Sequence, residues 1–156
     1  MGAANKCGVI VANTSPSTFT GSAPFLTSAG AHAILHAALA EAEKIGVPQC
    51  VAVVDGGGHL LAFGRSDGAR IGSISIAQTK AISAATRKRP TAEEGGGDPI
   101  TSIRLALAAD RVTGIGGGLP IVVEGHVVGA IGVSSGTSDE DLAVGRAGLA
   151  VLQAQP

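Results

Sequence analysis

Apolar and polar positions fall into distinct blocks along this chain, and the clearest block predicts a β-hairpin over residues 48–65. Residues 50–54 form an apolar run rich in β-branched side chains, which is typical of a buried strand. Asp55 and three consecutive glycines follow, and glycine readily adopts the positive φ angles of tight hairpin turns. A second apolar run over residues 59–65 predicts the returning strand.

A second hairpin is predicted over residues 119–134. An apolar, β-branched run at residues 121–123 is followed by a Glu124-Gly125 turn and a long apolar run at residues 126–133. Sequence of helical character separates the two hairpins. This order predicts a mixed α/β (α+β) domain in which helices pack on an antiparallel sheet built from two hairpins.

Four segments show helical patterns. The first begins at Thr27 or Ser28, which are good N-cap residues, and runs to about residue 45, where glycine and proline stop it. The next two are predicted over residues 71–86 and 100–109. The last is predicted from residue 138 or 139 to about 152, with three acidic residues at its positive end.

Residues 1–26 are expected to form an extended N-terminal arm, and residues 27–156 a single domain. The start of the chain is rich in Ala, Asn, Ser, Thr and Gly, and residues 8–12 have the pattern of a short strand. We expect the apolar side chains of the arm to pack on a neighbouring subunit or across the domain's own sheet.

The amino-acid composition argues against nucleic-acid binding and against a membrane-spanning protein. With a net charge of −1, no Trp or Tyr and only three Phe, the 156 residues offer neither the charge nor the stacking surfaces for nucleic acid. No run of about 18 apolar residues and no signal-peptide pattern is present, so we expect no membrane span and a cytoplasmic location. Cys7 and Cys50 fit free thiols in a reducing compartment.

Several segments of the sequence resemble those of one known family. AVVDGGGHLLAFGRSDGA, KRPT, GGLPIVVEGHVVGAIGVSSGT and the closing acidic helix resemble the GlcG/HbpS-like haem-binding family, which includes the C-terminal domain of PduO-type proteins. The resemblance covers roughly residues 26–152 in unbroken order. It implies a profilin-like α-β-α domain with a five-stranded antiparallel sheet, assembly into dimers or larger homo-oligomers, and haem as a cofactor in some members.

His32 and His36 are candidates for a cofactor site. They are separated by one helical turn and therefore project from the same face of the first predicted helix. One imidazole could ligate haem iron, or the pair could hold a metal ion. The alternative is two polar residues on a partly exposed helix. Because no HExxH or CxxC motif supplies a third ligand, we predict no metal site.

Asp55 and His59 flank the glycine turn of the first hairpin. A carboxylate beside an imidazole can orient it as a general base. The alternative is that Asp55 simply accepts hydrogen bonds from the amides of the turn.

Arg65, Asp67 and Lys80 place two cations and a carboxylate after a predicted strand and on the following helix. Arg65 could clamp a substrate carboxylate or a haem propionate through two parallel hydrogen bonds. The alternative is an ion pair between Arg65 and Asp67 that closes the turn.

Two functions remain open from the sequence. The first is an oligomeric haem or small-ligand binding protein. The second is a cofactor-independent isomerase, lyase or hydrolase acting on a small carboxylate-bearing metabolite in a catabolic or biosynthetic pathway. In that enzyme Arg65 would hold the acid, and proton transfer would fall to Asp55, His59, Asp67 or Lys80. In both cases the small-residue helix and the apolar arm predict a homo-oligomer, a dimer at least.

Overall fold

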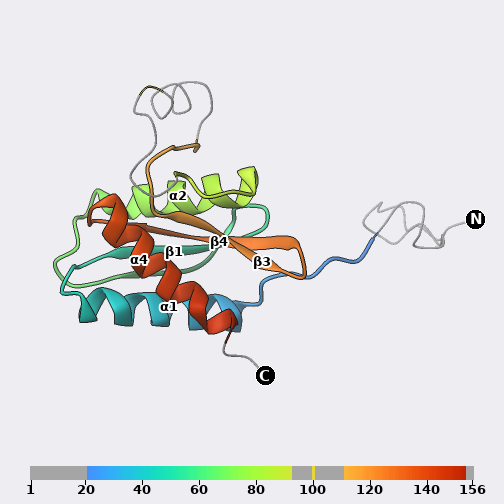
Figure 1. Cartoon of the computed structure of the whole chain (residues 1–156), viewed down its shortest axis with the longest axis horizontal. Helices are drawn as coiled ribbons and strands as arrows, with labels where there is room; N and C mark the ends of the chain where they lie inside the picture. The colour runs from blue at the N-terminus through green and yellow to red at the C-terminus, as the bar shows by residue number, and fades with distance from the viewer. Residues whose placement is uncertain (1–20, 93–99, 101–110, 154–156) are drawn as a thin grey trace, which may run out of the picture.

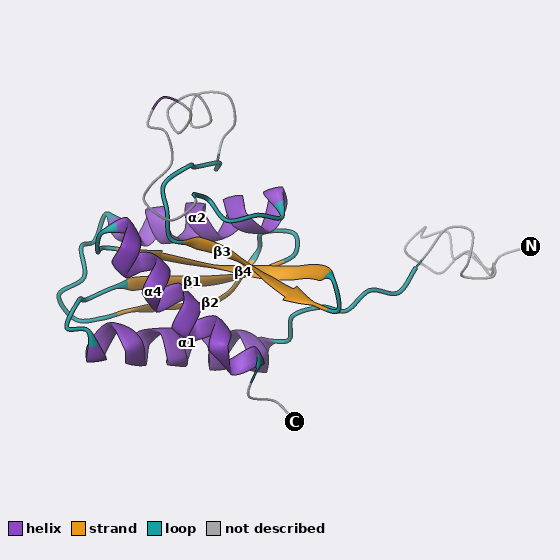
Figure 2. Ribbon diagram, in the orientation of Figure 1, coloured by secondary structure: helices purple, strands orange, loops and turns teal. Residues whose placement is uncertain are grey.

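The computed structural model describes residues 21–92, 100 and 111–153. A sheet lies between α2 on one face and α1 and α4 on the other (Figure 1), and Figure 2 distinguishes its strands from the helices that cover them. In chain order the elements are α1 (Ser28–Lys44), β1 (Cys50–Asp55), β2 (Leu60–Arg65), α2 (Ser73–Arg87), β3 (Gly118–Val123), β4 (His126–Ser134), α4 (Ser138–Leu149) and the short 3₁₀ helix η1 (Ala150–Leu152).

The strand order is β2-β1-β4-β3, and every neighbouring pair is antiparallel. The two predicted hairpins are therefore joined through their inner strands, with Cys50 opposite Ser134 and Asp55 opposite Gly129. Because β1 lies in the middle of the sheet, five of its six residues are buried. The predicted antiparallel sheet with helices packed on it is confirmed.

The expectation of a five-stranded sheet is wrong for the described part of the chain, which contains four strands. Each strand-forming run within that part is used by one of the two hairpins, so none is left to extend an edge. The strand pattern at residues 8–12 lies outside the described residues. So do most of the predicted arm and all but the first residue of the helix predicted over residues 100–109.

Local signals place the helix ends close to the predicted positions. The Thr27 hydroxyl accepts a hydrogen bond from the Gly30 N–H and so begins α1. Thr137 and Glu140 form a reciprocal capping box at the start of α4. Lys88, in the left-handed conformation, ends α2. Within the described residues, no helix combines the length and hydropathy needed to cross a membrane.

The alternation of side chains along the strands divides the core into two halves. Val51 and Val53 point toward α1 and α4, where the larger apolar side chains gather. Cys50, Ala52 and Val54 point toward α2, where most of the buried side chains are small. The layer on the α2 side is consequently thin, and the helix backbone lies close to the sheet.

Gly132 of β4 makes this close approach possible. A methyl group at this position would overlap the carbonyl oxygen of Ala77 and the amide nitrogen of Ala81, both in the backbone of α2. Backbone atoms inside a helix cannot move aside without breaking its hydrogen bonds. The separation between α2 and the sheet is therefore set by the absence of a side chain at residue 132.

We expect the Gly132→Ala variant to lose about 1–3 kcal/mol or more of its free energy of unfolding, because the added methyl forces helix and strand apart. Urea denaturation monitored by circular dichroism measures the loss. Gly72→Ala is the matched control, since a methyl there meets no atom within 4 Å. Equal stability of the two variants would show that α2 does not press on β4 at this point.

Candidate functional site

A groove beside the C-terminal half of α1 and the end of β2 brings together three of the residues that the sequence singled out. His36, Arg65 and Asp67 all line it, and its volume of about 660 Å³ lies within the range of small-molecule sites, about 300–1,000 Å³. We call it the His36 groove. Its remaining lining is mostly apolar and is supplied by Leu39, Ala40, Ala42, Val47 and Pro48, with Glu43, Gly46 and Ser66.

The structure distinguishes between the two histidines of α1. Both are exposed and their ring centroids are 6.3 Å apart, but only His36 belongs to the groove lining. His32 Nδ1 donates a hydrogen bond to the Ser28 carbonyl oxygen at 2.8 Å, which leaves its Nε2 as the acceptor nitrogen. Among the described residues, no cluster of three His, Cys, Asp or Glu side chains could hold a metal ion.

Arg65 and Asp67 lie at the exposed end of the edge strand β2. Within the described part of the chain, no ion pair links the two side chains, so the alternative of an ion pair closing the turn is not observed. Arg65 stands opposite Cys50 in the sheet, and its positive charge opposes the effect of burial, which raises the pKa of the Cys50 thiol. The charged side chains in the lining of the His36 groove are the guanidinium of Arg65 and the carboxylates of Glu43 and Asp67.

Asp55 and His59 form a local unit at the tip of the first hairpin. Asp55 Oδ1 accepts hydrogen bonds from the amides of Gly57 at 2.8 Å and His59 at 2.9 Å, and the His59 ring nitrogen Nδ1 lies 3.2 Å away. Burial alone would raise the pKa of the Asp55 carboxyl, but these donors hold that pKa below its usual value. The His59 side chain is 82% exposed. The geometry matches the turn-forming alternative, and a general-base role stays a prediction.

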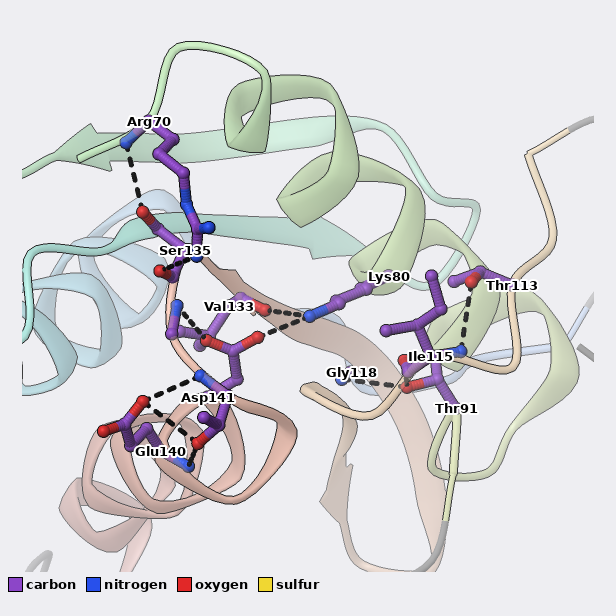
Figure 3. Close-up of polar contacts among 12 residues, drawn as sticks. Arg70, Lys80, Thr91, Thr113, Ile115, Gly118, Val133, Ser135, Glu140 and Asp141 are labelled. Carbon is purple, nitrogen blue, oxygen red and sulfur yellow. Dashed lines mark hydrogen bonds and ion pairs between the residues drawn. The ribbon is translucent and has the colours of Figure 1, made fainter. Parts of the chain in front are cut away.

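Lys80 lies away from Arg65 and Asp67. Its ammonium donates to Asp141 Oδ2 at 2.6 Å and to the Val133 carbonyl oxygen at 2.8 Å (Figure 3). The side chains of Lys80 and Asp141 are only 2% and 3% exposed. The residues predicted to act together as an enzyme site thus occupy three separate places, namely the hairpin tip, the His36 groove and this buried ion pair.

The ion pair connects α2 with α4 at one end of the sheet. Burial lowers the pKa of the Lys80 ammonium, and the Asp141 carboxylate opposes that effect. The second carboxylate oxygen of Asp141 accepts from the Gly136 N–H at 3.0 Å. Gly117 leaves room for the pair, because a methyl there would lie 2.9 Å from both Lys80 Nζ and Asp141 Cβ.

Asp141 is the residue that sequence reasoning missed. It counted only as one of several acidic residues at the positive end of the last helix. One signal was nevertheless present in the sequence. Asp141 precedes the buried residues Val144, Gly145 and Gly148 at helical spacing, so it lies on the buried face of α4. A carboxylate on a buried helix face requires a partner.

Threonines fix the glycine-rich segment that leads into β3. Thr91 donates its hydroxyl to the Ile115 carbonyl oxygen at 2.7 Å and accepts the Gly118 N–H at 3.0 Å. Thr113 accepts the Ile115 N–H through its hydroxyl (Figure 3). These bonds satisfy backbone groups that would otherwise lack partners where the chain turns toward the sheet.

Comparison with known proteins supports the resemblance indicated by the sequence. The family described as haem degrading protein HbpS-like matches residues 26–150. Protein GlcG of Escherichia coli K12 is 40% identical over 105 residues, which are 67% of this chain and 77% of GlcG. The structure of HbpS from Streptomyces reticuli is 33% identical, has a TM-score of 0.76, and aligns over 92% of this chain and 97% of that one.

A structure of the PduOC:heme complex is similar in fold. It aligns over 81% of this chain and 94% of its own length, with a TM-score of 0.70 and 22% identity. Together these relatives confirm the predicted resemblance to GlcG, HbpS and PduO.

Replacing one partner of the buried ion pair should lower the free energy of unfolding far more than replacing both. We expect Lys80→Met and Asp141→Asn each to lose about 3–5 kcal/mol of the free energy of unfolding, because an uncompensated charge or polar group is left buried. The double variant Lys80→Met/Asp141→Asn should regain most of this loss. Denaturant unfolding of all four proteins gives the coupling energy, and additive losses would contradict a direct interaction.

The Asp55 turn predicts a pH-dependent contribution to stability. Asp55→Ala should lose about 0.5–1.5 kcal/mol at neutral pH, the usual net value of a hydrogen bond. The folded-state pKa of Asp55 lies below the unfolded value of 3.8, so this contribution is present above that value and disappears as the pH falls through the folded-state pKa. Unfolding curves of wild type and variant should therefore converge in acid. Asp67→Ala, an exposed carboxylate, serves as control, and a difference independent of pH would contradict the assignment.

Proposed function

Since this chain belongs to the haem degrading protein HbpS-like family, we propose that it binds haem and that the His36 groove is the binding site. The observation that carries the proposal is the meeting of an exposed imidazole, a guanidinium and an apolar wall in one groove. The sequence had marked His36 and Arg65 for haem separately. Their common location is what a haem site requires.

The groove residues fit the chemistry of haem. Imidazole is a common axial ligand of haem iron, and the exposed ring of His36 is available for that role. Leu39, Val47 and Pro48 supply an apolar wall for the macrocycle. His32 lies one turn away on α1 and outside the groove lining, so His36 is the proposed ligand. The ring of His32, whose centroid is 6.3 Å from that of His36, would instead help to orient the His36 ring.

The charged side chains of the groove determine where the propionates of haem would bind. Arg65 is the cation of the groove lining, and a guanidinium can bind a carboxylate through two parallel hydrogen bonds. Glu43 and Asp67 line the same groove and repel a carboxylate placed near them. The propionates should therefore point toward the Arg65 end, which gives the bound haem one preferred orientation.

When bound, haem would supply iron for redox chemistry or for the binding of small gases. The contribution of the protein would be to offer the His36 imidazole, to shield one side of the macrocycle from water and to fix its orientation through Arg65. A small carboxylate-bearing ligand could use the same guanidinium, as the sequence suggested.

Assembly forms part of the same proposal. The His36 groove is open on one side, and exposed apolar side chains lie elsewhere on the chain, among them Phe25 at 79% and Ile71 at 75%. Burial of such side chains between copies of the chain would stabilise a closed homo-oligomer.

The proposal predicts that haemin titration of the purified protein gives a Soret shift that saturates near one haem per chain. His36→Ala should abolish this shift. Arg65→Lys should weaken binding about tenfold to hundredfold, because the charge remains but the two-pronged geometry is lost. Thermal unfolding of Arg65→Lys should stay close to wild type, since the side chain is exposed.

Two matched variants separate the possible outcomes. His126→Ala removes an exposed imidazole far from the groove lining and should leave the titration unchanged. His32→Ala should weaken binding only slightly. If His36→Ala binds haemin as wild type does, the ligand assignment is wrong, and loss of binding in His32→Ala alone would move it to that residue.

A further inference from the structure

A second cleft lies beside the buried ion pair, and both Lys80 and Asp141 contribute to its lining. It has a volume of about 440 Å³ and is formed by the start of α2, the end of β4 and the start of α4. It shares no lining residue with the His36 groove. Serines 73, 134, 135 and 138 all contribute to its lining, and we call it the serine cleft.

Two of these serines are buried and have unused hydroxyl groups. Ser73 and Ser134 are each 5% exposed, and within the described part of the chain neither hydroxyl has a hydrogen-bond partner, although neither hydroxyl oxygen is completely shielded from solvent. Ser134 stands opposite Cys50 in the sheet and so faces α2, where Ser73 is the first residue. Each hydroxyl can therefore donate to a ligand in the cleft without giving up a hydrogen bond within the protein.

The N-terminus of α2, which is the positive end of the helix dipole, also borders the cleft. This 15-residue helix has no side-chain cap and no acidic residue in its first turn, and Gly72 and Ser73 at its start line the cleft. The N–H groups of Ser73 and Ile74 donate to the carbonyl oxygens of Arg70 and Ile71, so it is the helix dipole that favours an anion at this end. By contrast, α4 also begins at the cleft, but Thr137 and Glu140 cap it.

Arg70 adds a formal positive charge at the mouth of the cleft. Its backbone N–H donates to the Ser135 hydroxyl at 3.1 Å, and its guanidinium donates to the Ser135 carbonyl oxygen (Figure 3). Ser135 has a φ of +119°, a conformation that favours glycine, so the Arg70 contacts hold a strained residue in place. The remaining N–H groups of the guanidinium can bind a ligand.

The carboxylate in the lining of the cleft is already paired with a cation. Asp141 lines the cleft, but its two carboxylate oxygens accept from Lys80 and from the Gly136 N–H. Lys80 uses two of its three N–H donors on Asp141 and Val133. The balance of charge and of free donors in the cleft therefore favours an anion.

Apolar side chains limit the kind of anion. Ile76 and Ile115 line the same cleft and are 40% and 51% exposed. Ser73, Ile76 and Lys80 follow one stripe of α2 at helical spacing, so polar and apolar groups are placed side by side along the cleft. A ligand with a charged head and a short hydrocarbon part matches this arrangement.

We propose that the serine cleft binds a small organic carboxylate. The carboxylate accepts hydrogen bonds from the hydroxyl groups of Ser73 and Ser134 at the positive end of α2. Arg70 faces its charge, and the hydrocarbon part lies against Ile76 and Ile115. This site is independent of the His36 groove, so it stands whether or not the chain binds haem.

Nuclear magnetic resonance of the ¹⁵N-labelled full chain tests the proposal, with propionate and inorganic phosphate as probes. Propionate should give saturable shifts of the amides at the start of α2 and at residues 134–136. Ser134→Ala and Ser73→Ala should each weaken binding about tenfold, the usual effect of losing a hydrogen bond to a charged group. Both replace a small side chain by a smaller one, and Ser22→Ala, an exposed serine that lines neither the serine cleft nor the His36 groove, is the control.

Each outcome decides the assignment. Saturable shifts with propionate whose affinity weakens in Ser134→Ala and Ser73→Ala, but not in Ser22→Ala, support a carboxylate site. Saturation by phosphate with no response to propionate would overturn the carboxylate and leave a phosphate site. Absence of saturable shifts with either probe, or equal affinity in all three variants, would overturn the site itself. A haemin titration of Ser134→Ala should match wild type, which separates this proposal from the haem proposal.

Discussion

The buried ion pair between Lys80 and Asp141 connects two helices that lie on opposite faces of the sheet. Lys80 belongs to α2 on one face, and Asp141 belongs to α4 on the other. Between them the ammonium also bonds to the Val133 carbonyl oxygen of β4, and the carboxylate accepts the Gly136 N–H of the following loop. Two helices, a strand and a loop thus depend on one charge pair, whose desolvation is offset only while every partner is in place.

Glycine makes this arrangement sterically possible. A methyl group at residue 117 would crowd the ion pair, and one at residue 132 would overlap the backbone of α2. Gly148 has a similar role between α4 and α1, since a methyl there would lie 3.0 Å from the Ile34 carbonyl oxygen. The high glycine content therefore reflects close packing of layers as well as tight turns.

Two of the cavities among the described residues differ in their chemistry and lie at different parts of the sheet. The His36 groove lies beside the edge strand β2 and is mostly apolar, with a histidine and an arginine, which suits a large flat ligand. The serine cleft lies where β4 meets the starts of two helices, and it presents serine hydroxyl groups and the positive end of α2 to a small anion. The ion pair forms part of the lining of the second cavity only, so the element that stabilises the fold also shapes one of its two candidate binding sites.

The sequence by itself determined the local elements and the family. The Asp55 turn and the Thr27 cap depend on residues within a few positions of one another, so spacing alone predicts their hydrogen bonds. For the last helix the sequence predicts a start at residue 138 or 139, whereas the structure places the cap at Thr137. The sequence also placed His32 and His36 on one helix face. Only the packing of α1 beside β2 put His36 in a groove with Arg65 and left His32 outside its lining.

Tertiary structure alone decided the remaining features. Lys80 and Asp141 are 61 residues apart, and nothing in the local pattern of either residue names the other as its partner. The pairing of β1 with β4, the four strands of the described chain and the gathering of the serines around one cleft have the same origin. Local hydrogen bonds and side-chain periodicity are set within one or two turns of chain, whereas contacts between distant residues depend on how closely whole layers can approach, and that distance is fixed by packing.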